Sequence, residues 1–204
     1  MRVRSRIIGL ALLAGAATGF PVRADECPRQ ENALAGYVVD IGSGRRFSVT
    51  SDSSPYVVST MFEGEQRVQR EQLYQGYFPL EVASPRGTLF RKPGESLREF
   101  FPIADGKTAK FEVRPEFNGN IGKPQMIELK ALNQTDVDVG GCTYRVWRIA
   151  RKTRDEDGKL ITDVVDYYSP DLRCVLGREI HKEDGGISTQ IYKNIRPRGR
   201  SDLL

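Results

Sequence analysis

The sequence has little of the chemistry on which most hydrolases and metal sites depend. It contains one histidine, His181, so a histidine-based catalytic triad would have no other base to use. Neither G-x-S-x-G nor H-E-x-x-H occurs, and His181 with Cys174 and Glu179 lacks the spacing of a zinc site. We therefore predict no catalytic residue, no metal site and no cofactor. An enzyme built on carboxylates and tyrosines is the alternative.

The sequence also lacks a hydrophobic run of transmembrane length. Its first apolar run, Ile7–Phe20, is shorter than the roughly 20 residues that a membrane-spanning helix needs. Three arginines precede this run and PVRA follows it, which is the pattern of a secretory signal peptide. We expect residues 1–24 to be a signal peptide cleaved between Ala24 and Asp25, and the mature chain to be exported to the periplasm. An uncleaved N-terminal anchor is the alternative.

The expected mature chain has no net charge. The full sequence has 31 basic and 27 acidic residues, but residues 1–24 hold four arginines and no acid, which leaves 27 of each. This balance gives no support to a nucleic-acid partner or to binding at an anionic membrane surface. Arginines are locally enriched near the C-terminus, in RPRGRSDLL, so we expect residues 196–204 to form a flexible basic tail.

No part of the mature chain has the period of a long amphipathic helix, and alternation of apolar and polar residues dominates. Turn-forming residues divide this pattern into short segments, as in a meander of antiparallel strands. We predict a mainly β fold, a single domain over residues 25–195, curled into a sandwich or an open or half barrel with at most one or two short helices. A short helix is expected around Glu95–Phe100. Strands are expected near Tyr37–Ile41, Arg46–Ser51, Tyr56–Phe62, Glu65–Tyr77, Lys110–Arg114, Gln125–Asp138, Thr143–Lys152, Leu160–Tyr168, Cys174–His181 and Ile187–Asn194.

The register of one hairpin can be predicted. The sequence DEDGK between two strand patterns favours a three-residue loop, Glu156–Gly158, with Gly158 in the left-handed conformation. In this register Arg148 faces Asp166, and apolar side chains face one another across the two strands. A two-residue loop would set Ile149 against Asp166, so we reject it.

Three cysteines remain after the expected cleavage, and cysteines of exported proteins are disulfide candidates. We predict a disulfide between Cys142 and Cys174, because both lie in strongly patterned sequence. In the chain-entropy model such a bond contributes about 3–4 kcal/mol. Cys27 lies beside the expected new N-terminus, where chains are often loose. Pairing through Cys27 is the alternative.

Four aromatic residues lie on the strands around the predicted disulfide: Tyr144, Trp147, Tyr167 and Tyr168. Together they are able to form a patch on which a ligand stacks. They are equally suited to fill the core, where cross-strand aromatic pairs are frequent in β-rich proteins. We predict that they belong to the core.

Two segments, FFPIADGKTAKFEV (Phe100–Val113) and DYYSPDLRCVLGREI (Asp166–Ile180), resemble a pattern of small exported β-rich proteins of Gram-negative bacteria. In those proteins an apolar-Pro-apolar segment with Gly-Lys precedes a strand, and a Tyr-x-Pro turn joins two strands. Many of them have no assigned activity. The resemblance implies an envelope β domain and carries over no catalytic residue.

These observations together lead us to expect a soluble periplasmic, non-enzymatic domain that binds an envelope protein or lipid. One version is a carrier that holds a lipid or another apolar ligand in the concave side of a curled sheet. The other is an interaction module that uses an exposed strand edge. The carrier requires a large apolar cavity, whereas the interaction module requires an exposed edge and a solid core.

Overall fold

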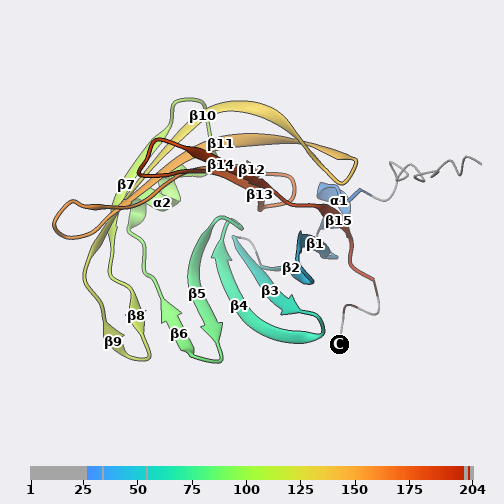
Figure 1. Cartoon of the computed structure of the whole chain (residues 1–204), viewed down its shortest axis with the longest axis horizontal. Coiled ribbons are helices and arrows are strands. Elements are labelled where there is room, and N and C mark those ends of the chain that lie inside the picture. The colour runs from blue at the N-terminus through green and yellow to red at the C-terminus, as the bar shows by residue number, and fades with distance from the viewer. Residues whose placement is uncertain (1–26, 34, 54, 200–201, 203–204) are drawn as a thin grey trace, which may run out of the picture.

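The computed structural model describes residues 27–33, 35–53, 55–199 and 202. Two antiparallel sheets make up most of this part of the chain (Figure 1). The first sheet has nine strands in the order β15-β1-β2-β3-β4-β5-β6-β8-β9, and the second has six in the order β14-β13-β12-β11-β10-β7. The expected signal peptide, with its cleavage between Ala24 and Asp25, lies outside the described residues.

The elements are short, apart from three long strands in the second sheet. The nine-stranded sheet consists of β1 (Tyr37–Gly42), β2 (Arg45–Ser53), β3 (Tyr56–Glu63), β4 (Gln66–Tyr74), β5 (Phe78–Ser84), β6 (Gly87–Phe90), β8 (Glu116–Phe117), β9 (Asn120–Ile121) and β15 (Asn194–Pro197). The six-stranded sheet consists of β7 (Thr108–Val113), β10 (Gln125–Val139), β11 (Cys142–Arg154), β12 (Leu160–Ser169), β13 (Cys174–His181) and β14 (Ile187–Ile191). Two helices occur in the described part of the chain, α1 (Gln30–Ala33) and α2 (Glu95–Phe100).

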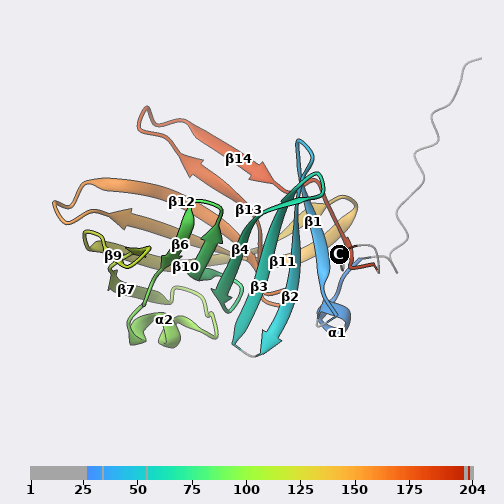
Figure 2. The ribbon, with the colours of Figure 1, turned by 90° about the horizontal axis from the view of Figure 1, so that it is seen from below.

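The six-stranded sheet arches over strands β1–β5, so that the inner faces of the two sheets enclose a common interior (Figures 1 and 2). Within the described residues the sheets do not close into a barrel. The predicted fold class, an antiparallel β meander curled into a sandwich or half barrel with short helices, is confirmed.

Most predicted strands occur within a few residues of their expected bounds, but the hairpin of β5 and β6 was not predicted. Its sequence contains Pro79 in the first strand and Pro85 in the turn, and proline is unusual inside a strand. In the structure Pro79 lies opposite Leu73 of β4, at a register irregularity where a missing backbone donor is tolerated. The hairpin adds two strands to the sheet and brings Arg91 to its inner side.

Two clusters of buried side chains fill the interior. The first joins the two sheets near α1 and contains Tyr37, Val39, Val49 and Leu176, among others. The second surrounds Phe100 of α2 and includes residues of β7, β10 and β11. Leucine and phenylalanine on one side of α2 are fully buried there, so this short helix is held by packing rather than by its own length.

The predicted loop of the β11–β12 hairpin agrees with the structure, but the predicted register does not. Gly158 has a φ of +79°, and the Asp155 amide donates to the Lys159 carbonyl, as a three-residue loop requires. A bulge next to Arg154 then shifts the pairing by one residue. Ile149 therefore pairs with Asp166, the arrangement that the sequence led us to reject.

The predicted disulfide is also corrected, because Cys27 is bonded to Cys142 and Cys174 is a free thiol. The prediction assumed that β12 extends alongside the start of β11. In the structure the pairing of these strands begins only at Trp147, five residues beyond Cys142. Cys142 instead follows the β10–β11 turn and packs against Cys27 in the first cluster.

Arg196, the first residue of the expected flexible tail, belongs to a strand. Arg196 lies in β15 and pairs with Val38 of β1. Its guanidinium forms an ion pair with Asp202 at 2.7 Å, and this contact holds the pKa of the Asp202 carboxyl at about 2. The domain boundary predicted at residue 195 therefore falls inside a strand.

Candidate functional site

A cavity of about 470 Å³ lies between the inner faces of the two sheets. Strands β1–β4 supply its floor, and β11–β13 supply its roof. Sites for single small molecules usually have volumes of about 300–1,000 Å³. The wall combines apolar side chains with six charged ones, which are Glu71, Arg91, Arg151, Asp166, Arg173 and Arg178.

Asp166 on β12 anchors the charged groups of the roof, and its side chain is 1% exposed. Its Oδ1 accepts a hydrogen bond from Arg178 Nε at 2.9 Å, and its Oδ2 accepts one from Arg151 Nε at 2.9 Å. The Tyr77 hydroxyl donates to Oδ2 at 3.1 Å. Both oxygens of Asp166 therefore accept hydrogen bonds, and the carboxylate holds the two arginines in place.

Glu71 on β4 faces this group from the floor. Burial raises the pKa of its carboxyl, and the hydrogen bond from Gln69 and the charges of Arg91 and Arg178 offset this only in part. Burial also lowers the pKa of the Arg91 guanidinium; attraction to Glu71 opposes that shift, and repulsion from Arg151 adds to it. Arg91 and Arg151 therefore bring like charges from opposite sheets toward each other.

Arg173 lies in the turn between β12 and β13 and also lines the cavity. One terminal nitrogen donates to Ser51 Oγ at 3.2 Å. Its Nε and other terminal nitrogen are buried, and no acceptor for them lies among the described residues. The turn sits so close to Gly76 that a Cβ there would lie 1.6 Å from the Arg173 carbonyl oxygen. The fold thus holds a guanidinium with unsatisfied donors at the cavity wall, a costly arrangement without an anion or water.

The free thiol of Cys174 lines the same cavity. Burial raises the pKa of this thiol to about 11, and a hydrogen bond with Tyr37 offsets the rise only in part. The Tyr37 hydroxyl in turn donates to the Leu172 carbonyl at 2.8 Å. A thiol with a raised pKa holds little thiolate at neutral pH, and the thiolate is the nucleophilic form.

The polar and apolar parts of the cavity lie in different places. Val49, Ser59 and Glu71 are directly paired across β2, β3 and β4, so they form one row along the floor. Beside the Val49 end of this row, Val39 pairs with Phe47. The floor therefore changes from apolar at β1 and β2 to charged at β4.

The wall of the cavity carries more positive than negative charge. Four arginines face two carboxylates, an excess of two positive charges when both carboxylates are ionised. General acid–base hydrolysis commonly uses two carboxyl groups that are free to exchange protons. Of the two cavity carboxylates, Asp166 is fully engaged by its partners, which leaves Glu71 alone.

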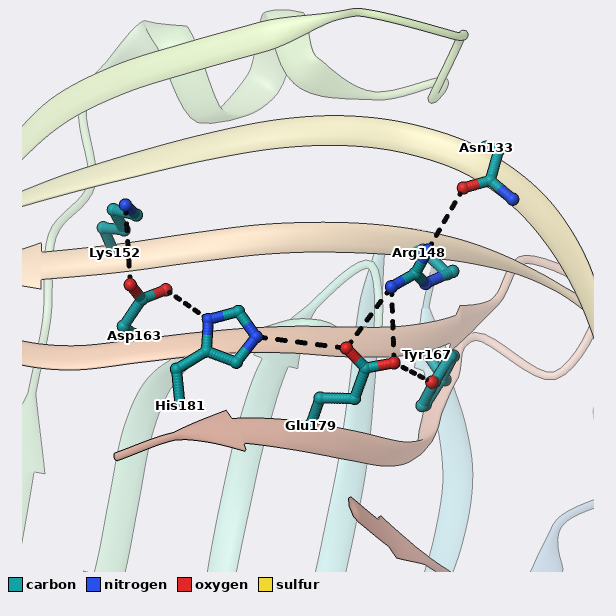
Figure 3. Close-up of polar contacts among 7 residues, drawn as sticks. All are labelled: Asn133, Arg148, Lys152, Asp163, Tyr167, Glu179 and His181. Atoms are coloured by element: carbon teal, nitrogen blue, oxygen red, sulfur yellow. Dashed lines mark hydrogen bonds and ion pairs between the residues drawn. The ribbon is translucent and has the colours of Figure 1, made fainter. Parts of the chain in front are cut away.

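The outer face of β11–β13 carries a second group of polar side chains (Figure 3). Glu179 accepts hydrogen bonds from Arg148 at 3.3 Å and from the Tyr167 hydroxyl. His181 lies between two carboxylates, with Nδ1 3.4 Å from Asp163 Oδ1 and Nε2 4.0 Å from Glu179 Oε2 (Figure 3).

The ladder in Figure 3 continues at both ends. Lys152 lies opposite Asp163 and forms an ion pair with it at 3.4 Å, and Arg148 also donates to Asn133 at 3.4 Å. The outer group is partly exposed: the His181 side chain is 37% and the Arg148 side chain 30% accessible. It has the character of a solvated surface ladder, with cross-strand pairs of the usual kind.

The four aromatic residues singled out in the sequence lie in packing positions. Tyr144 and Tyr167 belong to the first cluster, Tyr168 belongs to the second, and Trp147 packs against the second. The Tyr168 hydroxyl donates to the Gln75 carbonyl at 2.6 Å. Other aromatic residues line the cavity, namely Phe47, Tyr77, Phe78 and Tyr192.

Sequence reasoning did not identify the cavity residues. The alternation in β4 is visible, but its inner positions include Gln69, Glu71 and Leu73, so polarity alone does not reveal which face is inside. Arg91 follows a strand that was not predicted, and Asp166 was placed opposite the wrong arginine. The sequence did predict a turn before Cys174 that joins β12 and β13, and these two strands pair in the structure.

Comparisons with known proteins give one structural likeness. No protein-family model matches the sequence, and no curated protein matches it. Among solved structures, the chain is similar to the crystal structure of the hypothetical lipoprotein YmcC from Escherichia coli (K12), at 10% identity and a TM-score of 0.48. The match covers 86% of this chain and 91% of that chain. A likeness at this level assigns neither a family nor a function.

Two further findings concern the described part of the chain. It contains no helix that is long and apolar enough to cross a membrane. It also contains no group of three or more histidine, cysteine, aspartate or glutamate side chains arranged to hold a metal ion.

Proposed function

We propose that this protein is an exported, non-enzymatic binding protein that holds a small envelope molecule in the cavity between its two sheets. The cavity itself carries this proposal, because it is large enough for a small molecule and its wall includes buried donors without partners. A binding site accounts for both features at once. This is the carrier version of the sequence-based expectation, with a partly charged cavity in place of a purely apolar one.

Export is supported by two independent observations. The N-terminal sequence has the pattern of a signal peptide. The Cys27–Cys142 bond joins residues 115 positions apart, and such structural disulfides persist in oxidising compartments such as the periplasm.

Native mass spectrometry of protein purified from the periplasm of its own cell tests the proposal. We expect a mass above that of the mature chain in the native spectrum and its loss after denaturation, with release of a small molecule. The matched control is a variant with a blocked cavity, Ser59→Phe, which places a large side chain on the floor between Val49 and Glu71. Unliganded wild-type protein, together with no binding from a periplasmic small-molecule extract, would contradict the proposal.

A protein partner is the second candidate, and β14 supports it. This strand is an edge of the six-stranded sheet, carries no charge, and leaves Ile187 64% and Ile191 42% exposed. Natural sheets usually protect such edges with charges or proline. A co-purifying protein in the same native spectrum, lost on Ile187→Lys but retained on Ser59→Phe, would favour this candidate.

A further inference from the structure

We infer that the ligand of the cavity is an acidic amphiphile, a single apolar chain that ends in a carboxylate or phosphate group. This inference rests on the proposed function and names the class of its ligand. The anionic group binds to arginines of the cavity wall, and the apolar chain extends over the apolar side chains of the floor.

The charged end of the cavity favours an anion. Arg178 and Arg151 each use their Nε to bind Asp166, so the fold already neutralises part of their charge. Arg91 lines the cavity from the other side, where its charge is attracted by that of Glu71 and repelled by that of Arg151. The wall carries four arginines against two carboxylates, so an anion in the cavity would be attracted by the excess positive charge and would accept hydrogen bonds from guanidinium groups.

Arg173 supplies an independent observation. Two of its guanidinium nitrogens are buried without an acceptor in the described chain, although buried polar atoms of folded proteins are almost always hydrogen-bonded. A neutral apolar ligand would leave these donors unsatisfied. A ligand with acceptor oxygens would satisfy them, and a carboxylate or phosphate presents such oxygens in the geometry that guanidinium groups match.

The other end of the cavity favours a hydrocarbon chain over a sugar or a free anion. Val39, Phe47 and Val49 form a continuous apolar surface on β1 and β2, and the Phe47 ring lies 6.3 Å from that of Tyr192. Burying methylene groups on such a surface adds affinity in proportion to chain length. An inorganic anion would use the arginines but would make no contact with these apolar side chains.

Isothermal titration calorimetry of the mature protein at pH 7.5 and low salt tests the inference with four probes below their micellar concentrations. These are decyl phosphate, decanoate, decanol and inorganic phosphate. We expect both acidic amphiphiles to bind at least about tenfold more tightly than decanol, and inorganic phosphate to bind more weakly than decyl phosphate. The ratio of decyl phosphate to decanoate affinity then tells a phosphate-bearing ligand from a fatty acid.

Variants show whether the predicted groups hold the anion. Arg91→Gln is expected to weaken decyl phosphate binding about tenfold or more and to leave decanol binding unchanged. Arg86→Gln is the matched control, because Arg86 is exposed in the turn of the same hairpin. Arg173→Gln serves as a second variant, so that a folding defect of Arg91→Gln would still leave the inference open to test.

The outcomes separate this inference from the proposed function. Equal affinity for decanol and decyl phosphate, or no effect of both Arg91→Gln and Arg173→Gln, would contradict the acidic amphiphile and leave a binding protein with a neutral ligand. Failure of every probe to bind, combined with the absence of a co-purifying small molecule, would contradict both the acidic amphiphile and the proposed function as a binding protein.

Discussion

On the inner face of β11–β13, Asp166 lies between two arginines in a cavity. On the outer face of the same strands, Glu179 lies between Arg148, which is partly exposed, and Tyr167, which is largely buried. The residue types are alike, but the side chain of Asp166 is 1% exposed and that of Glu179 is 16% exposed. Charge interactions strengthen as water is excluded, and the penalty for losing one partner grows with them. The two faces therefore differ in environment, with a desolvated charge cluster inside and partly solvated pairs outside.

The largest difference between the faces is expected when an aspartate is replaced on each. Asp166→Asn leaves Arg151 and Arg178 without their shared anion, and breaking a buried pair commonly costs about 3–5 kcal/mol. We expect about 3 kcal/mol, the low end, because the Arg178 side chain is 40% exposed. Urea unfolding of both variants measures the effect. Asp163→Asn on the outer face is the matched control, expected to cost about 1 kcal/mol or less; equal losses would remove the distinction between the faces.

The Cys174 thiol, which lines the cavity, should react slowly with alkylating reagents in the folded protein. Because burial raises the pKa of Cys174 to about 11, its thiolate fraction at pH 8 is about 100-fold lower than that of an ordinary thiol. We expect iodoacetamide to modify Cys174 slowly in the folded protein and rapidly in urea, measured by peptide mass mapping without reduction. The same map should show Cys27 joined to Cys142. Fast labelling of the folded protein, or a disulfide to Cys174, would contradict this account.

Glu71 should make stability depend on pH in a particular direction. Its pKa is raised mainly by burial, so its contribution to stability is fully present below the usual glutamate pKa and is lost as pH rises through the folded value. Glu71→Gln does not titrate. We expect the melting temperature of this variant, relative to wild type, to increase from pH 4 to pH 7 in ligand-free protein. A difference that is constant or that decreases with pH would show that Glu71 is not in a desolvated site.

The smallest change in the free energy of unfolding is expected when an arginine on the outer face is replaced. Arg148 contacts Glu179 and Asn133, but Glu179 keeps the Tyr167 hydroxyl as a donor when Arg148 is removed. Arg148→Gln should therefore change the free energy of unfolding by about 1 kcal/mol or less, in the range of exposed ion pairs. Arg151→Gln is its inner counterpart and should cost more, since it deprives the buried Asp166 of a partner. Chemical unfolding that ranks the two variants in the opposite order would contradict the comparison.

The hairpin of β11 and β12 shows how far sequence reasoning reached. The loop was predictable because Gly158 has to occupy a left-handed conformation, and the structure has it there. The bulge beside Arg154 carries no comparable signal, and it moves every later pair by one position. Strand β13 was predicted with its observed bounds, so local alternation is informative where turns limit both ends.

The cavity was beyond prediction for a different reason. Its two charged centres, Glu71 and Asp166, lie on different sheets and 95 positions apart in the chain. Nothing local in β4 or β12 indicates that their inner faces meet. The disulfide was mispredicted for the same reason, since the contact of Cys27 with Cys142 depends on how the N-terminal segment packs against the finished sheet.

The central claim is that anions bind to the inner face of β11–β13 and not to the outer face. Nuclear magnetic resonance of the arginine Nε–H groups, recorded while decyl sulfonate is added, tests it most directly because this probe stays ionised at every pH used. The account predicts saturable shifts of the Arg91, Arg151 and Arg173 signals, with the Arg148 signal unchanged. Shifts confined to Arg148 and other surface arginines, or no saturable shift at all, would contradict it.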